Sequence, residues 1–130
     1  MLPLAAETLP PSSPELSTAI REGFSRRGIA AREVTVEGGA FPKVERLRVD
    51  LTDARATRDL RFAQPGSADG SAFEAGSLEI SGAPLYFEAL PLNLKITAQN
   101  AGFTCASLGE GASLLALQRA ENGRLDIEFR

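Results

Sequence analysis

The sequence predicts an α+β fold, with one N-terminal helix packed on a mainly antiparallel sheet of about seven strands. Three observations predict it. Only residues 14–27 carry apolar side chains at the three- and four-residue spacing of a helix. From Val34 to Phe129, apolar and polar residues alternate in short runs broken by Gly, Pro, Asn and Asp. Mostly short turns join these runs, without helical crossovers, so the strands are expected to be largely antiparallel.

The chain has 130 residues, a length that fits one domain with a single core. Residues 1–13 contain three prolines and two serines with little periodicity, and we expect an extended arm there. Residues 14–130 are expected to form the single α+β domain.

The helix has recognisable start and stop signals. Ser13 is expected to cap it, because its side chain can accept from free backbone N–H groups, and Pro14 suits the first helical position. Gly28 is expected just beyond the last helical residue. The apolar face of the helix comprises Leu16, Ala19, Ile20, Gly23 and Phe24.

The strands are predicted from alternation with a period of two. The alternating apolar positions fall into successive groups: Val34 and Val36; Leu47, Val49 and Leu51; Leu60 and Phe62; Leu78 and Ile80; Leu90, Leu92, Leu94, Ile96 and Ala98.

Asn122-Gly123 predicts a hairpin near the end of the sequence, since this dipeptide favours a two-residue type I′ turn. The strands 114–121 and 124–130 would then pair, with Glu121 opposite Arg124 and Arg119 opposite Asp126.

Composition excludes several function classes. The net charge is −3 with acidic and basic residues interspersed, which argues against nucleic-acid binding. There is no histidine, and the single Cys105 is expected to be a buried thiol rather than a reactive one. No apolar run approaches the roughly 18 residues that a membrane span needs, and we expect no targeting segment in this chain.

No set of residues suited to catalysis is evident, so we expect that the protein is not an enzyme and that it binds no cofactor. Without histidine the commonest general base is missing, and neither a phosphate-binding loop nor paired cysteines for zinc occur. Asp50, Asp53 and Asp59 could form a metal or acid–base site. A solvated strand end is the favoured interpretation, because the spacing of a calcium loop is absent.

The only local concentration of basic residues lies around the helix end, and two interpretations stay open. The side chains could complement the helix dipole on a solvated face, or attract an anionic lipid headgroup. The four candidates are Arg21, Arg26, Arg27 and Arg32.

Tyr86 and Phe87 are adjacent aromatic residues in a predicted strand, so they should point to opposite faces. Only one can enter the core under the helix. The other would lie on a protected surface or contact an apolar ligand or partner.

Part of the chain resembles the LmeA-like phospholipid-binding family, a former domain of unknown function. A helix at 16–27 runs into VTVEGGAFP at 34–42, which is similar to the pattern V-x-V-x-G-x-x-F-P of that family. The next strand of that family has the pattern l-x-v-x-l, which is matched here by Leu47, Val49 and Leu51. The run FEAGSLEI at 73–80 is similar in style to the strands that come after it in the family. The resemblance covers about residues 16–100.

The resemblance implies one N-terminal helix packed on a curved, mainly antiparallel sheet, similar in style to tubular lipid-binding proteins. It also implies a periplasmic or envelope-associated protein of bacteria. The helix face and the inner faces of the strands would then flank an acyl-chain groove. The chain lacks a second long helix to close a tube. The candidate ligand-binding residues are Ile20, Phe24, Tyr86, Phe87, Leu90 and Leu92.

The leading hypothesis is therefore a non-enzymatic module that binds a lipid or another apolar ligand. Its partners would be a phospholipid or fatty acid and a membrane surface, with a protein partner unknown. The alternative is a structural or protein-interaction module with a filled core. A third hypothesis is a catalytically silent domain of a larger enzyme. A ligand-sized cavity beside the helix would discriminate the first two.

Overall fold

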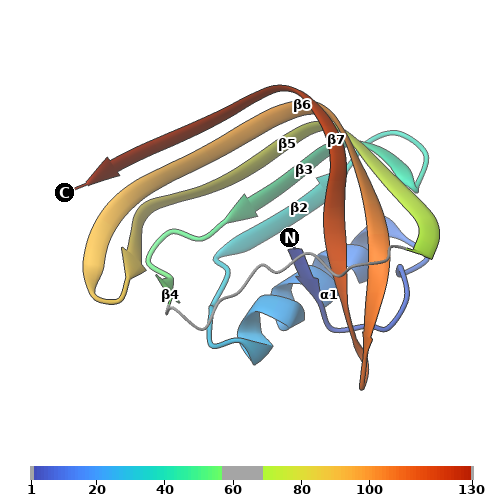
Figure 1. Cartoon of the computed structure of the whole chain (residues 1–130), viewed down its shortest axis with the longest axis horizontal. Coiled ribbons are helices and arrows are strands. Elements are labelled where there is room, and N and C mark those ends of the chain that lie inside the picture. The colour runs from blue at the N-terminus through green and yellow to red at the C-terminus, as the bar shows by residue number, and fades with distance from the viewer. Residues whose placement is uncertain (1, 57–68, 130) are drawn as a thin grey trace.

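The computed structural model describes residues 2–56 and 69–129, which form one helix against a curved sheet (Figure 1). The fold is α+β, as predicted. The elements are β1 (Leu2–Leu4), α1 (Ser13–Arg26), β2 (Glu33–Glu37), β3 (Lys43–Asp50), β4 (Arg55–Ala56), β5 (Asp69–Phe87), β6 (Leu90–Gly109) and β7 (Ala112–Phe129).

The sheet is mixed, which corrects the expectation of a mainly antiparallel one. Its order is β1-β7-β6-β5-β3-β2, with β4 also on β5. β5 runs parallel to both β3 and β4, while the other pairs are antiparallel. A parallel pair needs a connection of a dozen residues or more, and residues 51–68 separate β3 from β5. The strand expected at Leu60 and Phe62 lies outside the described residues.

The helix begins one residue earlier than predicted. Ser12 is the cap, and its hydroxyl accepts from the backbone N–H of Glu15 at 3.4 Å. Gly28 follows the helix with φ of +79°, the left-handed conformation expected of it. The predicted apolar face is buried at every position: Leu16, Ala19, Ile20, Gly23 and Phe24.

The N-terminal residues belong to the core. Within 1–13, where an extended arm was expected, Leu2–Leu4 form β1 and pair with β7. Leu2 and Leu4 are buried, and the backbone N–H of Ala5 donates to the carbonyl of Ala19 in α1 at 3.0 Å. These residues therefore connect the helix to the far edge of the sheet.

β6 and β7 bend sharply where a hairpin was predicted, and that prediction is wrong. β7 runs without interruption from Ala112 to Phe129, and the turn that joins it to β6 lies at Glu110-Gly111. Asn122 does have a positive φ, +51°, but as part of a bulge in which two residues of β7, Asn122 and Gly123, lie opposite one residue of β6.

The charge pairs expected of that hairpin do not form. Arg119 instead bonds to Glu74 of β5, and Arg124 pairs with Asp126 of its own strand at 2.9 Å. A second bulge at Asn100, with φ of +48°, lies beside the first. The Asn100 amide donates to the Glu121 carboxylate at 2.8 Å, so the two bulges share one corner of the sheet.

The core lies on the concave side of this bend, between the sheet, α1 and β1 (Figure 1). Phe73 is fully buried there, with ring centroids 5.8 Å from Phe41 and 5.9 Å from Phe103. Cys105 is buried too, as predicted, and its thiol lies 3.4 Å from the hydroxyl of Ser113.

Candidate functional site

An apolar cavity of about 420 Å³ lies on the concave side, beside the end of α1. Binding sites for small molecules have volumes in this range and are lined mainly by apolar side chains. Every described residue that lines the cavity is apolar: Leu2, Phe24, Ile29, Leu51, Ala56, Ile80, Leu85, Phe87, Leu92, Leu94, Ile96 and Ile127.

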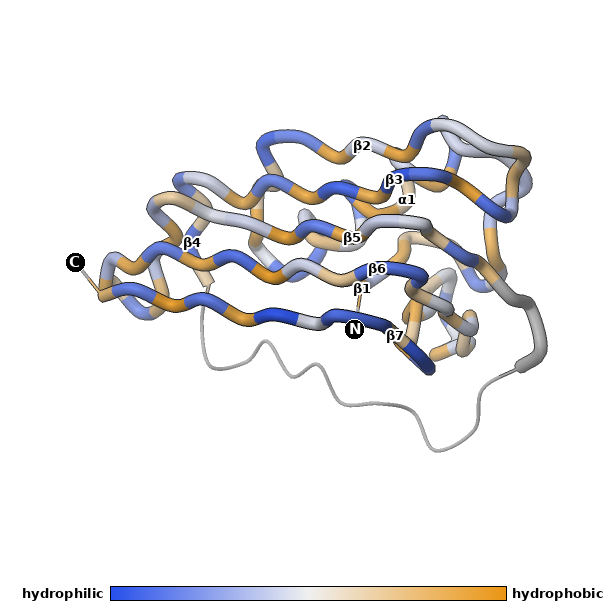
Figure 2. Tube along the Cα trace, turned by 90° about the horizontal axis from the view of Figure 1, so that it is seen from above, coloured by the Kyte–Doolittle hydropathy of each residue, from blue (hydrophilic) through white to orange (hydrophobic). Residues whose placement is uncertain are grey.

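The floor of the cavity is built by cross-strand neighbours. Ile80 of β5 pairs with Ile96 of β6, and Leu94 of β6 pairs with Ile127 of β7. Directly opposite residues of paired strands project on the same face of a sheet. Alternation along each strand therefore places a continuous aliphatic surface toward the helix. Figure 2 shows hydrophobic and hydrophilic residues alternating along these strands.

The wall opposite this floor comes from the end of the helix. Phe24 and Ile29 are both buried and both line the cavity. The Ile29 N–H donates to the Phe24 carbonyl at 3.0 Å, which folds the chain back on itself after Gly28. Gly28, which ends the helix, thus also positions the wall of the cavity.

The apolar row continues past the cavity on β7. Leu125 and Phe129 alternate with Ile127 and are 60% and 68% exposed. Ile127 lines the cavity and is itself 50% exposed. The cavity is therefore open toward this end of the sheet rather than enclosed.

Three of the six predicted ligand-binding residues line the cavity: Phe24, Phe87 and Leu92. Ile20 is fully buried in the core and does not line it. Leu90 is exposed and also lies outside the lining.

Tyr86 has a different environment from Phe87. The Arg55 guanidinium lies 5.8 Å from the centroid of its ring. Tyr86 is absent from the cavity lining, whereas its neighbour Phe87 belongs to it. The expected division of the two aromatic residues between opposite faces agrees with these contacts.

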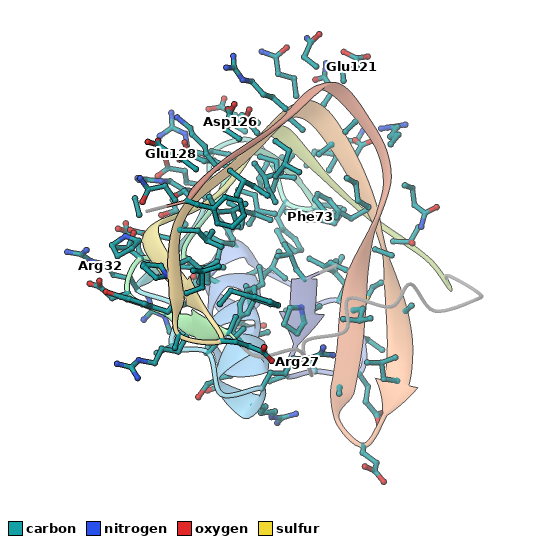
Figure 3. The ribbon with its side chains drawn as sticks, turned by 60° about the vertical axis from the view of Figure 1, so that its left-hand side comes forward. Arg27, Arg32, Phe73, Glu121, Asp126 and Glu128 are labelled. Atoms are coloured by element: carbon teal, nitrogen blue, oxygen red, sulfur yellow. The ribbon has the colours of Figure 1, made fainter. Side chains whose placement is uncertain are left out.

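The four arginines do not converge on one point. Arg26 donates to the carbonyl of Gly111 in the β6–β7 turn at 3.0 Å. Arg32 lies near Asp50 at the end of β3. Figure 3 shows Arg27 and Arg32 well apart. Arg27 is half-buried and is the residue that caps the C-terminal end of α1.

The outer face of the sheet is polar and charged. Glu79 of β5 pairs with Arg48 of β3 at 2.8 Å and with Lys95 of β6 at 3.5 Å. Asp126 and Glu128 lie on the same outer side (Figure 3). Such exposed pairs contribute at most about 1 kcal/mol each, so this face is best described as a solvated surface.

Asp50 is part of a hydrogen-bonded strand end. Burial would raise the pKa of its carboxyl, but hydrogen bonds from Thr52 and the positive charges of Arg32 and Arg48 lower the pKa below its ordinary value of 3.8. The backbone N–H of Thr52 donates to the carboxylate at 2.9 Å. Within 2–56 and 69–129 no group of three or more His, Cys, Asp or Glu side chains could hold a metal ion. Asp59 lies outside the described residues.

Sequence reasoning missed most of the cavity lining. Alternation marked Ile80, Leu94 and Ile96 as apolar, but nothing local indicated which face of their strand would stay unfilled. Leu2 carried no signal at all, because its segment lacks periodicity. Ile127 was assigned to a hairpin that does not form.

Comparison with known proteins yields no match: no family model, no curated protein and no solved structure is similar to this chain. Among the described residues, no helix is both long and apolar enough to cross a membrane.

Proposed function

We propose that this protein is a non-enzymatic module that binds an acyl chain, from a fatty acid or a phospholipid, in the cavity beside α1. The observation that carries the proposal is the lining: all of its described residues are apolar, and they come from the helix, from five strands of the sheet and from the loops after α1 and β3. A ligand with hydrogen-bonding groups along its length would leave those groups unpaired there. A hydrocarbon chain would not.

The energetics favour such a ligand. Burying hydrocarbon stabilises a complex by about 0.8 kcal/mol per methylene, so eight or so methylenes contribute about 6 kcal/mol. Part of this offsets the loss of translational and conformational freedom on binding. Contact of eight methylenes alone then gives a dissociation constant no tighter than about 40 μM, without specific polar groups.

An anionic headgroup would lie at the end of α1. Of the four candidate arginines, Arg27 is the half-buried one, and it lies in the sequence between Phe24 and Ile29, which both line the cavity. We assign it the headgroup contact within this proposal.

The proposal agrees with the resemblance to the LmeA-like phospholipid-binding family. It includes membership of that family and a location at the bacterial envelope. The alternative, a protein-interaction module with a filled core, is less well supported because the space beside the helix is not filled by side chains.

A pair of matched variants tests the proposal. Ile127→Asp adds a charge to the cavity lining, while Leu108→Asp adds the same charge to a side chain outside the lining. The two native side chains are 50% and 48% exposed, so the two variants should affect folding similarly. Binding of fluorescently labelled palmitate is measured by titration, and native mass spectrometry of the purified protein detects lipids carried from the cell.

We expect the native protein and Leu108→Asp to bind the probe alike. Ile127→Asp should weaken binding roughly tenfold or more, because a carboxylate in an apolar site costs more than about 1.4 kcal/mol. Equal binding by Ile127→Asp and Leu108→Asp would contradict the proposed site. A native protein that takes up neither palmitate nor phospholipid would contradict the function.

A further inference from the structure

β1 lies at one edge of the sheet, and among the described strands it pairs with only part of β7. β1 pairs with Ser113, Leu114 and Leu115. Beyond the bulge at Asn122, residues 124–129 pair with β6 on one side and with no other described strand (Figure 2). An exposed strand edge presents unpaired N–H and C=O groups and is a template for another strand.

This segment of β7 has the features of a pairing edge rather than of a protected one. Its register with β6 is regular over six consecutive pairs, from Arg124 opposite Thr97 to Phe129 opposite Leu92. No proline, bulge or inward-pointing charge interrupts residues 124–129, although such features commonly protect edges. On its inner face Leu125, Ile127 and Phe129 are each at least half exposed.

The charges along this edge complement themselves. In an antiparallel pair of two identical strands, residues facing each other have numbers with a constant sum. If Leu125 faces Leu125 of a second copy, each Arg124 faces an Asp126, which gives two opposite-charge pairs on the outer face. Centring the pair one residue later would put Asp126 against itself, and one residue earlier Arg124 against itself.

We propose that a second copy of this chain pairs antiparallel along β7, with Leu125 on the two-fold axis. The sheets of the two copies become one over residues 124–126, and the two Leu125 side chains lie next to each other on the same inner face. The pairing itself does not depend on a bound ligand.

A cysteine placed on the proposed axis tests both the pairing and its register. Facing residues in antiparallel strands have Cα atoms about 4.5–5.5 Å apart, within the range of a disulfide. Leu125→Cys should therefore form a covalent dimer under mild oxidation. Ile127→Cys is the matched control on the same edge, because its counterpart in the second copy would lie roughly 13 Å away. Native Cys105 is buried and is retained in both variants.

A charge swap tests the same register without cysteine. Arg124→Asp and Asp126→Arg each replace two attractive pairs by repulsive ones. We expect each variant to raise the dimer dissociation constant about fivefold or more in sedimentation velocity, and the double variant to restore it. Both side chains are exposed, so folding should not change, and circular dichroism checks this.

A native protein that stays monomeric at high concentration would overturn the proposal, as would failure of Leu125→Cys to cross-link. A dimer in which Ile127→Cys cross-links faster, or in which the double charge variant is as weak as the single ones, would overturn the register. Failure of dimerisation with intact palmitate binding would leave the proposed function standing, so the two tests are separable.

Discussion

Asp50 illustrates how a single side chain joins two parts of this fold. Its carboxylate accepts from the backbone N–H of Thr52, while the Thr52 hydroxyl accepts from the backbone N–H of Ala83 at 3.2 Å. The end of β3 is thereby connected to the irregular point of β5 near Ala83. A residue that sequence analysis weighed as a catalytic or metal-binding carboxylate has a structural role here.

The lowered pKa of Asp50 predicts a dependence of stability on pH. A carboxyl whose pKa is lower in the folded protein contributes stability above its unfolded pKa, and this contribution is lost as pH falls through the folded pKa. Asp50→Asn should therefore lower the free energy of unfolding at pH 7 by up to about 1 kcal/mol. As the pH falls below the ordinary value of 3.8 and through the lower pKa of the folded protein, the stabilities of the native and variant proteins should converge.

Urea denaturation at neutral pH and at about pH 3 measures this difference. A deficit of the same size at both values would contradict the assignment, because it would mean that the substitution disturbs packing rather than charge. A variant as stable as the native protein at pH 7 would show that the ionised carboxyl contributes nothing.

At the scale of elements, the contact between α1 and β1 depends on a glycine. A Cβ at position 23 would meet the Pro3 carbonyl oxygen well inside contact distance and the Leu4 nitrogen at 2.9 Å. Gly23 lies within the helix, three residues before its end at Arg26, and glycine inside a helix is unfavourable by about 1 kcal/mol relative to alanine. The close approach of β1 accounts for a glycine at that position.

Gly23→Ala should therefore destabilise the protein by about 1–3 kcal/mol, although alanine favours the helix. The obstructing atoms belong to the backbone and cannot rotate away. Ser25→Ala, at an exposed position of the same helix, is the control and should change stability by less than about 0.5 kcal/mol. Thermal and urea denaturation of both variants measure the effect. A stabilising Gly23→Ala would show that β1 does not pack as described.

The helix was also the element that sequence analysis described best. Its apolar face, its terminating glycine and its length follow from local chemistry, and only its cap is displaced by one residue. The strands were located from alternation, but their partners were not. Pairing depends on which segments meet in space, and β3 lies beside β5 because of a long connection rather than a turn.

At the scale of the whole molecule, the shape depends on the corner formed by the two bulges of β6 and β7. Asn100 and Asn122 both have positive φ, and their amides bond to Glu121 and to Gln99, the latter at 2.7 Å. Asparagine tolerates this conformation better than most residues do. The bend turns the long strands around α1 and leaves the cavity between them.

Asn122→Val should lower the free energy of unfolding by about 1–3 kcal/mol, because a β-branched residue is strained at positive φ and loses the amide bond. Asn122→Gly, which adopts the same φ without strain, should lose only the hydrogen bond, about 1 kcal/mol. Urea denaturation compares the two. If both variants lost the same free energy of unfolding, the positive φ at position 122 would not be a requirement of the fold.

The sequence by itself determined the α+β class, the helix and its buried face, the alternation of the strands and the burial of Cys105. All of these depend on residues near one another in the chain. Only the tertiary structure decided the parallel pairing of β3 with β5, the place of β1 in the core and the use of Asn122 in a bend instead of a turn. It also decided which apolar residues line a cavity. A positive φ is a local preference, and whether a strand reverses or bends there depends on the strand paired with it. A cavity, likewise, exists only where packed elements fail to fill the space between them.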